Sequence, residues 1–359
     1  MGKRIVIMAG GTGGHVFPAL AVAELLKEQG WQVSWLGTRK GLESRVVPEQ
    51  GIEIDWLSVA GVRGKGFTSK ITAVFMLLKA CVQAMSILRK RKPDVVLGMG
   101  GFVAGPGGLM AKLLRLPLII HEQNRIPGTT NRLLARMANQ VLEAFPGSFS
   151  GKINAKSTGN PLRKRFLNAL ENEHRQLENE VRILIVGGSQ GAQILNEIVP
   201  EAIAELLKTG LAGLSVQVTH QTGAAMLSQV ESRYQVLGIN AKTHAFIEDM
   251  AAAYQWADLV ICRAGAMTVS EVAAMGTPAI FIPLPTAIDD HQTANARYLT
   301  DAGAGLLLMQ NDELTPLTLA EYITKALKNL AVMRVATQHC ARLDATAVVA
   351  GYCVAEAVL

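Results

Sequence analysis

Two glycine-rich turns are the segments of this sequence best suited to bind an anion. The first, at 10–15 (Gly-Gly-Thr-Gly-Gly-His), follows the apolar run 5–9, and the second, at 187–191 (Gly-Gly-Ser-Gln-Gly), follows the apolar run 183–186. Glycines allow a tight turn and a close approach of the main chain to a ligand, and the helix that follows presents free N–H groups. The turns therefore predict two phosphate-binding α/β domains that face one cleft.

Neither turn fits the two common nucleotide-binding patterns. A G-x-G-x-x-G motif that starts at Gly11 needs a small residue where Val16 stands, and residues 36–39 (Leu-Gly-Thr-Arg) lack the acidic residue expected after the second strand. No Gly-Lys-Ser/Thr follows either turn, so neither is a P-loop. A nicotinamide-dependent dehydrogenase is disfavoured, and a phosphate or sugar ligand is favoured.

Two further polar or glycine-rich segments follow apolar runs in the first half. A third glycine cluster, at 98–108, follows the run 95–97, and His-Glu-Gln-Asn at 121–124 ends the run that starts at Leu118. Ligands of parallel sheets bind at the carboxyl ends of the strands. We interpret the glycine cluster as a close approach of the main chain to a ligand, beyond what packing alone requires, and the polar group as functional.

His15 closes the first turn at the start of a helix. A histidine there can be a structural hydrogen-bonding residue or a helix cap, but its place inside the glycine turn makes it a candidate general base or hydroxyl-orienting group. In the second half, a turn of small residues leads into 266–271, whose N–H groups could bind a phosphate or sugar. Glu271 could hold a ribose diol. Residues 289–291 (Asp-Asp-His) lack a further ligand set, which favours sugar binding or helix capping over a metal site.

Apolar strand-like runs alternate with helical stretches along both halves of the chain. This order predicts parallel sheets with helices on both faces, hence an α/β protein. The predicted strands are 4–9, 32–36, 95–98, 118–121, 140–144, 181–186, 215–220, 259–262, 279–282 and 305–308, and helices include 17–29, 192–207, 269–275 and 292–302. The expected domains are 1–160 and 161–338. A helical segment, 336–359, follows, and from about 339 it could pack back on the first domain.

Composition narrows the classes of partner. The four cysteines, at 81, 262, 340 and 353, show no C-x-x-C spacing, which favours a reducing compartment over zinc or disulfides. Residues 1–160 carry 21 Lys and Arg against 9 Asp and Glu, whereas residues 161–359 carry 14 against 20. The basic first half favours an anionic partner (a membrane, a nucleic acid or a phosphorylated substrate), and chance variation between domains is the alternative.

One apolar segment of the basic half is framed by cations. Residues 71–78 lie between Lys70 and Lys79, and a basic run at 89–92 follows. No apolar run reaches the roughly 18–20 residues that span a bilayer. The segment fits either a helix that lies in an anionic membrane surface or an ordinary core helix.

The order of these motifs resembles that of the MurG family, the bacterial peptidoglycan N-acetylglucosaminyltransferases of glycosyltransferase family 28. The matching segments are 10–18, 98–106, 121–124, 187–192, 266–271 and 290–292 with Asn295, so they span the chain. The resemblance implies a GT-B architecture, with two Rossmann-like, doubly wound parallel-sheet domains facing a cleft. It also implies an inverting glycosyltransferase that moves N-acetylglucosamine from UDP-GlcNAc to the 4-hydroxyl of the MurNAc-pentapeptide of lipid I, giving lipid II in peptidoglycan synthesis.

The same resemblance implies roles for particular residues. The second domain would bind the donor, with Ser189 and Arg163 at the diphosphate and the main chain of Ile247 at the uracil. Glu271 would hold the ribose, and His15 is the candidate catalytic base. The other predicted substrate contacts are Thr12, Gly13, Gly14 and Asn124 from the first domain, and Ala266, Met267, Thr268, Val269, Ser270 and Gln292 from the second.

The resemblance further implies partners and location. The substrates would be UDP-GlcNAc and undecaprenyl-linked lipid I, with no nucleic acid and no cofactor or bound catalytic metal. The first domain would face the acceptor and an anionic membrane surface. The protein would be peripheral, on the cytoplasmic face of the bacterial inner membrane, with the cell-wall synthesis machinery as a candidate partner. The alternatives are a UDP-N-acetylglucosamine 2-epimerase of the same architecture and a related lipid glycosyltransferase with another acceptor.

Overall fold

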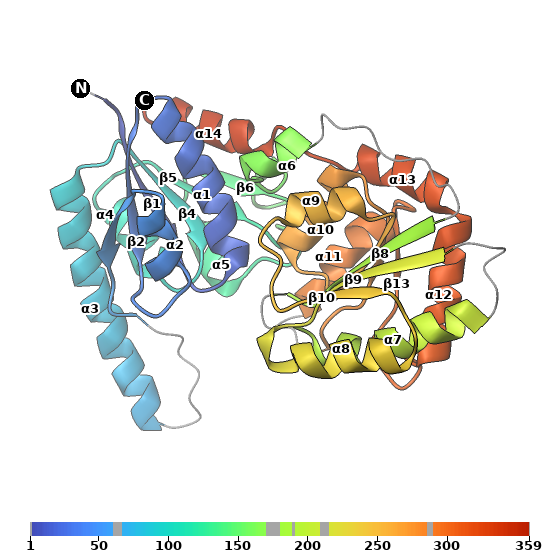
Figure 1. Cartoon of the computed structure of the whole chain (residues 1–359). Helices are drawn as coiled ribbons and strands as arrows, with labels where there is room; N and C mark the ends of the chain where they lie inside the picture. The colour runs from blue at the N-terminus through green and yellow to red at the C-terminus, as the bar shows by residue number, and fades with distance from the viewer. Residues whose placement is uncertain are drawn as a thin grey trace. The chain divides into compact units, whose positions relative to one another are not determined.

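The chain forms two compact units in a computed structural model (Figure 1). The first unit is Met1–Arg163 with Leu343–Leu359, and the second is Lys164–Arg342. The structure describes residues 2–59, 67–169, 180–188, 191–208, 215–285 and 290–358, with the backbone alone for 67–73. The boundary after Arg163 lies three residues beyond the predicted one, and the return to the first unit begins at Leu343 instead of about residue 339.

The described strands of the first unit form one parallel sheet in the order β3-β2-β1-β4-β5-β6-β7. They are β1 (Arg4–Ala9), β2 (Gln32–Gly37), β3 (Glu53–Trp56), β4 (Val95–Gly100), β5 (Leu118–Glu122), β6 (Gln140–Glu143) and β7 (Lys156–Ser157). Ile5 of β1 pairs with Val33 on one side and Val95 on the other. The strand order reverses between β1 and β4, so the ends of these two strands flank the point where such sheets bind ligands.

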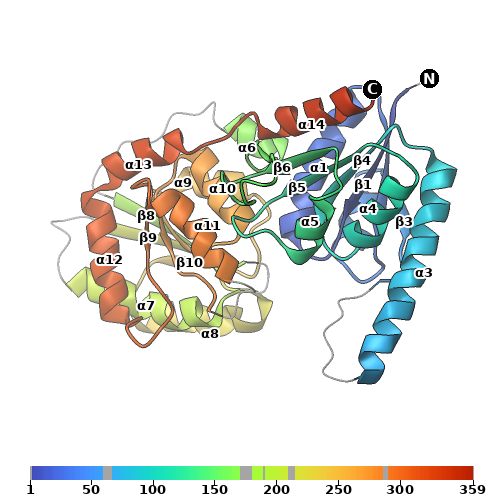
Figure 2. The ribbon, with the colours of Figure 1, turned by 180° about the vertical axis from the view of Figure 1, so that it is seen from behind.

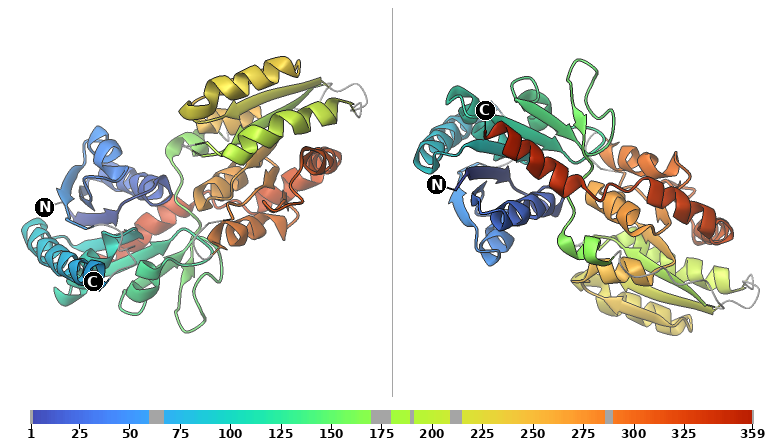
Figure 3. Two further views of the ribbon diagram at one scale, coloured as in Figure 1. Left: turned by 90° about the horizontal axis from the view of Figure 1, so that it is seen from below. Right: turned by 90° about the horizontal axis from the view of Figure 1, so that it is seen from above.

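Helices cover both faces of this sheet (Figure 2). The helices of the first unit are α1 (Gly13–Glu28), α2 (Glu43–Glu49), α3 (Phe67–Arg91), α4 (Ala104–Leu113), α5 (Thr129–Leu134) and α14 (Ala345–Glu356). On one face α14 lies beside α1, and Val349 and Cys353 join its core (Figure 3). On the other face α3 and α4 pack together through Ala84 and Met110. Strands buried on both faces require continuous apolar runs, as at 5–9.

The second unit repeats the arrangement with strands in the order β10-β9-β8-β11-β12-β13. Its strands are β8 (Glu180–Val186), β9 (Ser215–Gln221), β10 (Ala241–His244), β11 (Leu259–Cys262), β12 (Ala279–Phe281) and β13 (Gly305–Leu307), all parallel. Its helices are α6 (Lys164–Ala169), α7 (Gln193–Lys208), η1 (Ala224–Met226), α8 (Leu227–Val236), α9 (Met250–Trp256), α10 (Ala266–Met275), α11 (His291–Thr300), α12 (Pro316–Lys328) and α13 (Leu330–His339). The order reverses between β8 and β11, which places the second glycine turn at the switch point.

The predicted fold class is confirmed, since both units are doubly wound parallel sheets. All ten predicted strands are present, with ends within two residues of those expected. The edge strands β3, β7 and β10 were not predicted. They are short and largely polar (Glu-Ile-Asp-Trp, Lys-Ser and Ala-Lys-Thr-His), so they carry no apolar run. An edge strand contacts one neighbour only and buries less of its surface.

Two helix predictions are corrected. The helix expected at 17–29 begins at Gly13, so the first turn itself forms the first helical residues. The single helix expected at 336–359 is wrong: α13 ends at His339 and α14 begins at Ala345. Between these two helices the chain passes from the second unit, which ends at Arg342, to the first, which resumes at Leu343.

The apolar segment 71–78 lies in α3, and its described side chains face solvent. Val74, Phe75 and Leu78 are 58 %, 69 % and 58 % exposed, so the interpretation as a core helix is wrong for this part. The side chains of residues 71–73 lie outside the described part of the chain. Among the helices that the structure describes, none has both the length and the apolar composition of a membrane-spanning segment.

Candidate functional site

His15 lies in the first turn of α1, directly after β1. Thr12 is the N-cap with extended backbone (φ −105°, ψ 162°), and its side chain makes no capping hydrogen bond. The main-chain N–H groups of His15 and Val16 donate to the carbonyl of Thr12. The N–H groups of Gly13 and Gly14 precede these and have no acceptor within the helix. This end of α1 therefore presents donors and partial positive charge to an anionic or hydroxyl-rich ligand.

Glu43 holds the first glycine turn in place. Its carboxylate is fully buried and accepts hydrogen bonds from the N–H of Gly11 (2.9 Å) and from the N–H and hydroxyl of Thr38 (2.8 and 2.7 Å). A buried carboxylate is stable only with donors of this kind. Sequence reasoning missed Glu43, although it begins α2 shortly after the end of β2, at the same edge as the first turn.

Packing accounts for at least two glycines of the 98–108 cluster, while the predicted close approach of this segment to a ligand stays a prediction. A Cβ added at Gly101 would lie 2.3 Å from the carbonyl oxygen of Gly10, and one at Gly107 would lie 2.2 Å from the sulfur of Met8. The loop after β4 thus lies directly against the first turn. Gly11, with φ +98°, differs because an added Cβ would meet nothing within 4 Å.

The polar segment after β5 is mostly internal. His121 and Gln123 are fully buried, and Glu122 is 1 % exposed. Glu122 accepts hydrogen bonds from the N–H groups of Asn124 (2.9 Å) and Gly128 (3.1 Å) and from the side chain of Asn131 (2.9 Å). Three of the four side chains, those of His121, Glu122 and Gln123, are thus buried inside the first unit, whereas Asn124, the predicted substrate contact, is half-buried.

The ring of His15 belongs to a hydrogen-bonded chain that runs into the interior. Its Nδ1 lies 2.8 Å from Oε1 of Gln123, and Nε2 of Gln123 lies 3.0 Å from Nδ1 of His121. Nε2 of His121 lies 2.9 Å from the carbonyl oxygen of Gly159. Desolvation lowers the pKa of His121 to about 4, with the bond to Gly159 acting in the opposite direction. His121 is therefore neutral near pH 7.

Acidification is expected to destabilise the first unit through His121. In the unfolded chain this ring takes up a proton near its ordinary pKa of 6.5, whereas in the folded protein it stays neutral down to about pH 4. Between these values the unfolded state binds more protons. The contribution of His121 to the free energy of unfolding is thus fully present above pH 6.5 and falls by about 3 kcal/mol as the pH approaches 4. Urea unfolding of the parent and His121→Asn over this range measures the effect.

The control for this measurement is His339→Asn, because His339 is exposed at the end of α13. His121→Asn is expected to flatten the pH dependence of the free energy of unfolding, and His339→Asn to leave it as in the parent. Equal slopes for the parent and His121→Asn would contradict the assignment.

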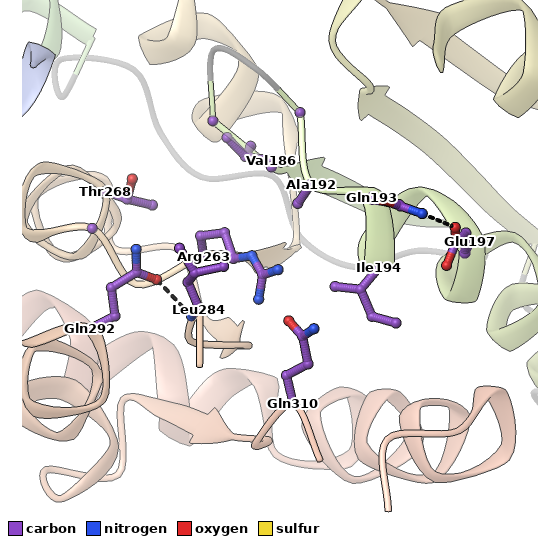
Figure 4. Close-up of a pocket in the computed structure, with 14 residues that line it drawn as sticks. Val186, Ala192, Gln193, Ile194, Glu197, Arg263, Thr268, Leu284, Gln292 and Gln310 are labelled. Atoms are coloured by element: carbon purple, nitrogen blue, oxygen red, sulfur yellow. Dashed lines mark hydrogen bonds between the residues drawn. The ribbon is translucent and has the colours of Figure 1, made fainter. Parts of the chain in front are cut away.

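In the second unit, a pocket of about 640 Å³ opens at the ends of β8 and β11 (Figure 4). The second glycine turn and the N-termini of α7 and α10 form its walls. Helix N-termini beside a glycine turn favour phosphate groups. The lining residues are Val186, Gly187, Gly188, Gly191, Ala192, Gln193, Ile194, Glu197, Arg263, Gly265, Thr268, Leu284, Gln292 and Gln310.

Arg263 supplies a cation to this pocket. It follows β11 directly, and its guanidinium donates to the carbonyls of Ile282 (2.9 Å) and Pro283 (3.0 Å). Burial lowers the pKa of Arg263 below its usual range, but an arginine remains charged at neutral pH. Sequence reasoning assigned it no role, although its place after a central strand is the signal that could have identified it.

Gln292 and Asn295 of α11 hold the main chain that leads into α10. Oε1 of Gln292 accepts hydrogen bonds from the N–H groups of Leu284 (3.0 Å) and Ala264 (3.3 Å). Nδ2 of Asn295 donates to the carbonyl of Ala264 (3.2 Å). Gln292 lines the pocket, and its amide nitrogen is directed away from Leu284 (Figure 4). The amide nitrogen is therefore the atom of Gln292 that can make the predicted contact with a sugar.

The predicted residues of α10 differ in what they offer a ligand. Thr268 lines the pocket, while Ala266 and Met267 stand at the start of the helix. Val269 is fully buried and its N–H donates to the carbonyl of Gly265, so its substrate contact stays a prediction. The hydroxyl of Ser270 donates to the carbonyl of Ala266.

Glu271 and Ile247 are both engaged within the protein. Glu271 is 9 % exposed, accepts a long hydrogen bond from Tyr254 (3.5 Å) and does not line the 640 Å³ pocket formed by described residues. The N–H of Ile247 donates to Oε1 of Gln221 (2.9 Å), whose Nε2 donates to the carbonyl of Gly188 (2.8 Å). Because this N–H is engaged, the carbonyl of Ile247 is the main-chain group that can make the predicted contact with the uracil. Gln221, which ties this loop to the second turn, was missed.

Two predicted diphosphate contacts remain predictions. Ser189 lies outside the described residues. Arg163 is the last residue of the first unit, and its guanidinium lies 4.8 Å from the ring centre of Phe17 on α1, a cation–π arrangement.

The described residues include no group of three or more His, Cys, Asp or Glu side chains placed to share a metal ion. All four cysteines are free thiols. That the activity needs no bound metal stays a prediction.

Comparisons with known proteins agree with these features. The chain is 58 % identical, over 99 % of both sequences, to the UDP-N-acetylglucosamine–N-acetylmuramyl-(pentapeptide) pyrophosphoryl-undecaprenol N-acetylglucosamine transferase of Methylococcus capsulatus. Its structure is similar to that of Acinetobacter baumannii MurG, with a TM-score of 0.83 and 41 % identity over 98 % of this chain and 99 % of that one. A UDP-GlcNAc 2-epimerase from Neisseria meningitidis shares the fold alone, with a TM-score of 0.66 and 14 % identity over 99 % of this chain and 100 % of that one.

Two family models match the chain. The N-terminal domain of glycosyltransferase family 28 matches residues 5–143, and the C-terminal domain of that family matches residues 182–347. The resemblance to the MurG family is confirmed by the relatives just described. The chain therefore belongs to glycosyltransferase family 28.

Proposed function

We propose that this chain transfers N-acetylglucosamine from UDP-N-acetylglucosamine to the 4-hydroxyl of the MurNAc-pentapeptide of undecaprenyl-linked lipid I, giving lipid II. The observation that carries this proposal is the 58 % identity, over 99 % of both sequences, to a relative whose name states this donor and acceptor. Because the sequences are this similar along their whole length, we assign the glycine turns, His15 and the pocket of the second unit to this transferase activity.

The second unit binds the donor. The N–H groups of the second turn and of the start of α10 meet the diphosphate, and Arg263 adds a positive charge as the departing UDP becomes more anionic. Gln292 offers its amide nitrogen to the sugar. Glu271 is assigned to the ribose, because its two carboxylate oxygens can accept from the diol hydroxyls as well as from Tyr254. These groups provide charge stabilisation without a bound metal.

The first unit supplies the base. The reaction inverts the anomeric carbon: the acceptor hydroxyl attacks from the face opposite UDP while His15 accepts its proton. The open N–H groups of Gly13 and Gly14, with Thr12 and Asn124, contribute polar contacts to substrate. Arg163 is assigned to the diphosphate charge.

One assay separates this function from its rivals. Labelled UDP-N-acetylglucosamine is incubated with and without a short-chain lipid I analogue. Transfer to the analogue supports the proposal, whereas an epimerised nucleotide sugar formed without acceptor supports a UDP-N-acetylglucosamine 2-epimerase. Sugar transfer to a sterol or diacylglycerol, but not to lipid I, supports a different lipid glycosyltransferase.

We further propose that the first unit docks on an anionic membrane surface. Half of the large apolar side chains exposed in the described part of the chain lie between Val74 and Leu133. The apolar patch comprises Val74, Phe75, Met76, Leu77, Leu78, Val82, Phe102, Leu109, Leu113 and Leu133, from α3, α4, α5 and the loop after β4.

A groove and nearby cations support this assignment. A largely apolar groove of about 720 Å³ runs along the patch, between Leu77 of α3 and Leu133 of α5. Arg136 lines this groove, and Lys79 of α3 and Lys112 of α4 are exposed on two of the helices that carry the patch. Apolar side chains framed by cations bind anionic lipid. The enzyme is thus assigned as peripheral on the cytoplasmic face of the inner membrane, where the cell-wall synthesis machinery is a candidate partner.

Replacing Phe75 with serine is expected to weaken liposome binding by about 10-fold or more, because burying a phenylalanine in lipid stabilises by roughly 1.5–3 kcal/mol. Flotation with anionic vesicles measures the partition coefficient. The control is Val236→Ser on α8 of the second unit, where Val236 is 84 % exposed and outside the patch. Equal effects of the two changes, or no binding at any salt concentration, would contradict the docking proposal.

A further inference from the structure

We propose that Gln123 and His121 are positioning residues that hold neutral His15 in one tautomer, with its proton on Nδ1 and the lone pair on Nε2. The observation is the chain of hydrogen-bond contacts from His15 through Gln123 and His121 to the carbonyl of Gly159. The catalytic meaning of this tautomer rests on the proposed function, but the tautomer itself does not.

The donors and acceptors of this hydrogen-bonded series are fixed, because the series ends at the carbonyl of Gly159. The carbonyl oxygen of Gly159 can only accept, so Nε2 of His121 must donate to it. His121 is fully buried and neutral, as its lowered pKa of about 4 requires. A neutral imidazole carries one proton, so Nδ1 of His121 is an acceptor.

The amide of Gln123 donates to His121 and accepts from His15. Its NH₂ group faces two acceptors, Nδ1 of His121 (3.0 Å) and the carbonyl oxygen of His121 (3.1 Å). Nitrogen and oxygen of an amide are assigned from such contacts, and here both contacts require the nitrogen. Oε1 of Gln123 therefore faces Nδ1 of His15 at 2.8 Å. An amide oxygen only accepts, so Nδ1 of His15 carries the proton.

The ring of His15 is also fixed in place. Gly100 has φ +99°, and a Cβ added there would lie 2.9 Å from Nδ1 and 3.0 Å from Cε1 of His15. The imidazole thus fills the space left by a missing side chain. Among the described residues, none bonds to Nε2, the nitrogen on the other side of the ring from Gln123.

This arrangement suits a general base. A free imidazole in water favours the proton on Nε2, which would place the lone pair toward the interior. The hydrogen bonds through Gln123 and His121 reverse this preference and leave Nε2 of His15 able to accept a proton. Once Nε2 is protonated, the bond from Nδ1 to Gln123 persists, and the amide oxygen stabilises the cation that forms. A base oriented by a third group is a recurring arrangement in nucleophilic catalysis.

The competing interpretation is that these contacts only fasten the loop after β5 to α1. Both interpretations predict lower stability when the contacts are removed. The contacts impose the tautomer under both interpretations, and only the positioning role predicts that a change of tautomer is accompanied by a loss confined to kcat. The experiments therefore read the tautomer directly and separate kcat from KM.

The first experiment is ¹⁵N NMR of the wild-type protein labelled in its histidine rings. The chain has seven histidines, so the signals of His15 are identified by their loss in His15→Gln. At a pH where the ring is neutral, Nδ1 is expected at a protonated, pyrrole-type shift and Nε2 at an unprotonated, pyridine-type shift. A neutral ring with its proton on Nε2 overturns the proposal, whatever reaction the enzyme catalyses.

The second experiment uses Gln123→Met, which removes the contacts of the Gln123 amide with His15 and His121 at similar side-chain volume. The expected results are mixed His15 tautomers and a kcat lower by about 10- to 100-fold, with KM for UDP-N-acetylglucosamine within about threefold. The matched control is Gln140→Met, because Gln140 begins β6 of the same sheet and bonds to Glu356 instead. A Gln123→Met protein that keeps both the tautomer and kcat overturns the proposal. A protein with no transferase activity but with the Nδ1–H tautomer retains the positioning role and rejects the proposed function.

Discussion

Replacing His15 with alanine is expected to lower kcat for sugar transfer by about 100-fold or more, because general-base assistance contributes about 10²- to 10⁴-fold. His15 stands at the open N-terminal turn of α1, and its ring occupies the space beside Gly100. The KM for the donor is expected to change little, since the donor is assigned to the second unit. Initial rates with a short-chain lipid I analogue measure both constants.

Two controls sharpen this test. Added imidazole is expected to restore part of the activity of His15→Ala, because the substitution leaves a ring-sized space next to Gly100. His339→Ala removes an exposed histidine from α13 and is expected to keep full activity. Turnover of His15→Ala within a few-fold of the parent would mean that another group accepts the proton.

Replacing Glu43 with alanine is expected to lower the free energy of unfolding of the first unit by about 3 kcal/mol. The carboxylate is fully buried and accepts three hydrogen bonds, from Gly11 and Thr38. Each buried donor left without an acceptor costs about 1–3 kcal/mol, and water entering the new space recovers part of this. Urea unfolding, followed by a signal from the first unit, measures the loss.

The matched control is Glu49→Ala, the same substitution at the exposed end of the same helix, α2. It is expected to change the free energy of unfolding by less than about 0.5 kcal/mol. Because Glu43 holds Gly11, Glu43→Ala is also expected to reduce kcat in the folded protein. An effect on stability as small as that of Glu49→Ala would show that the first turn is held by its packing against Gly101 instead.

Much of the fold was predictable because its signals are local. A strand buried on both faces reads as an apolar run, as at Ile183–Val186, and the helices between such strands follow turns rich in glycine. Strand alternation then predicts parallel sheets, and parallel sheets place the ends of their strands at one edge. The positions of His15 and of the second glycine turn at ligand-binding edges follow from this reasoning.

The sequence therefore determined the two α/β units, the edges at which ligands bind and the motifs shared with the family. Only the tertiary structure decided which polar residues complete those edges. Glu43 meets Gly11 across 32 positions, Gln221 meets Gly188 across 33, and Gln123 meets His15 across 108. No local pattern marks such pairs, because they are brought together by the order of strands in the sheet. Burial likewise decided that Val269 packs in the core while Arg263, three residues before the start of α10, reaches the pocket.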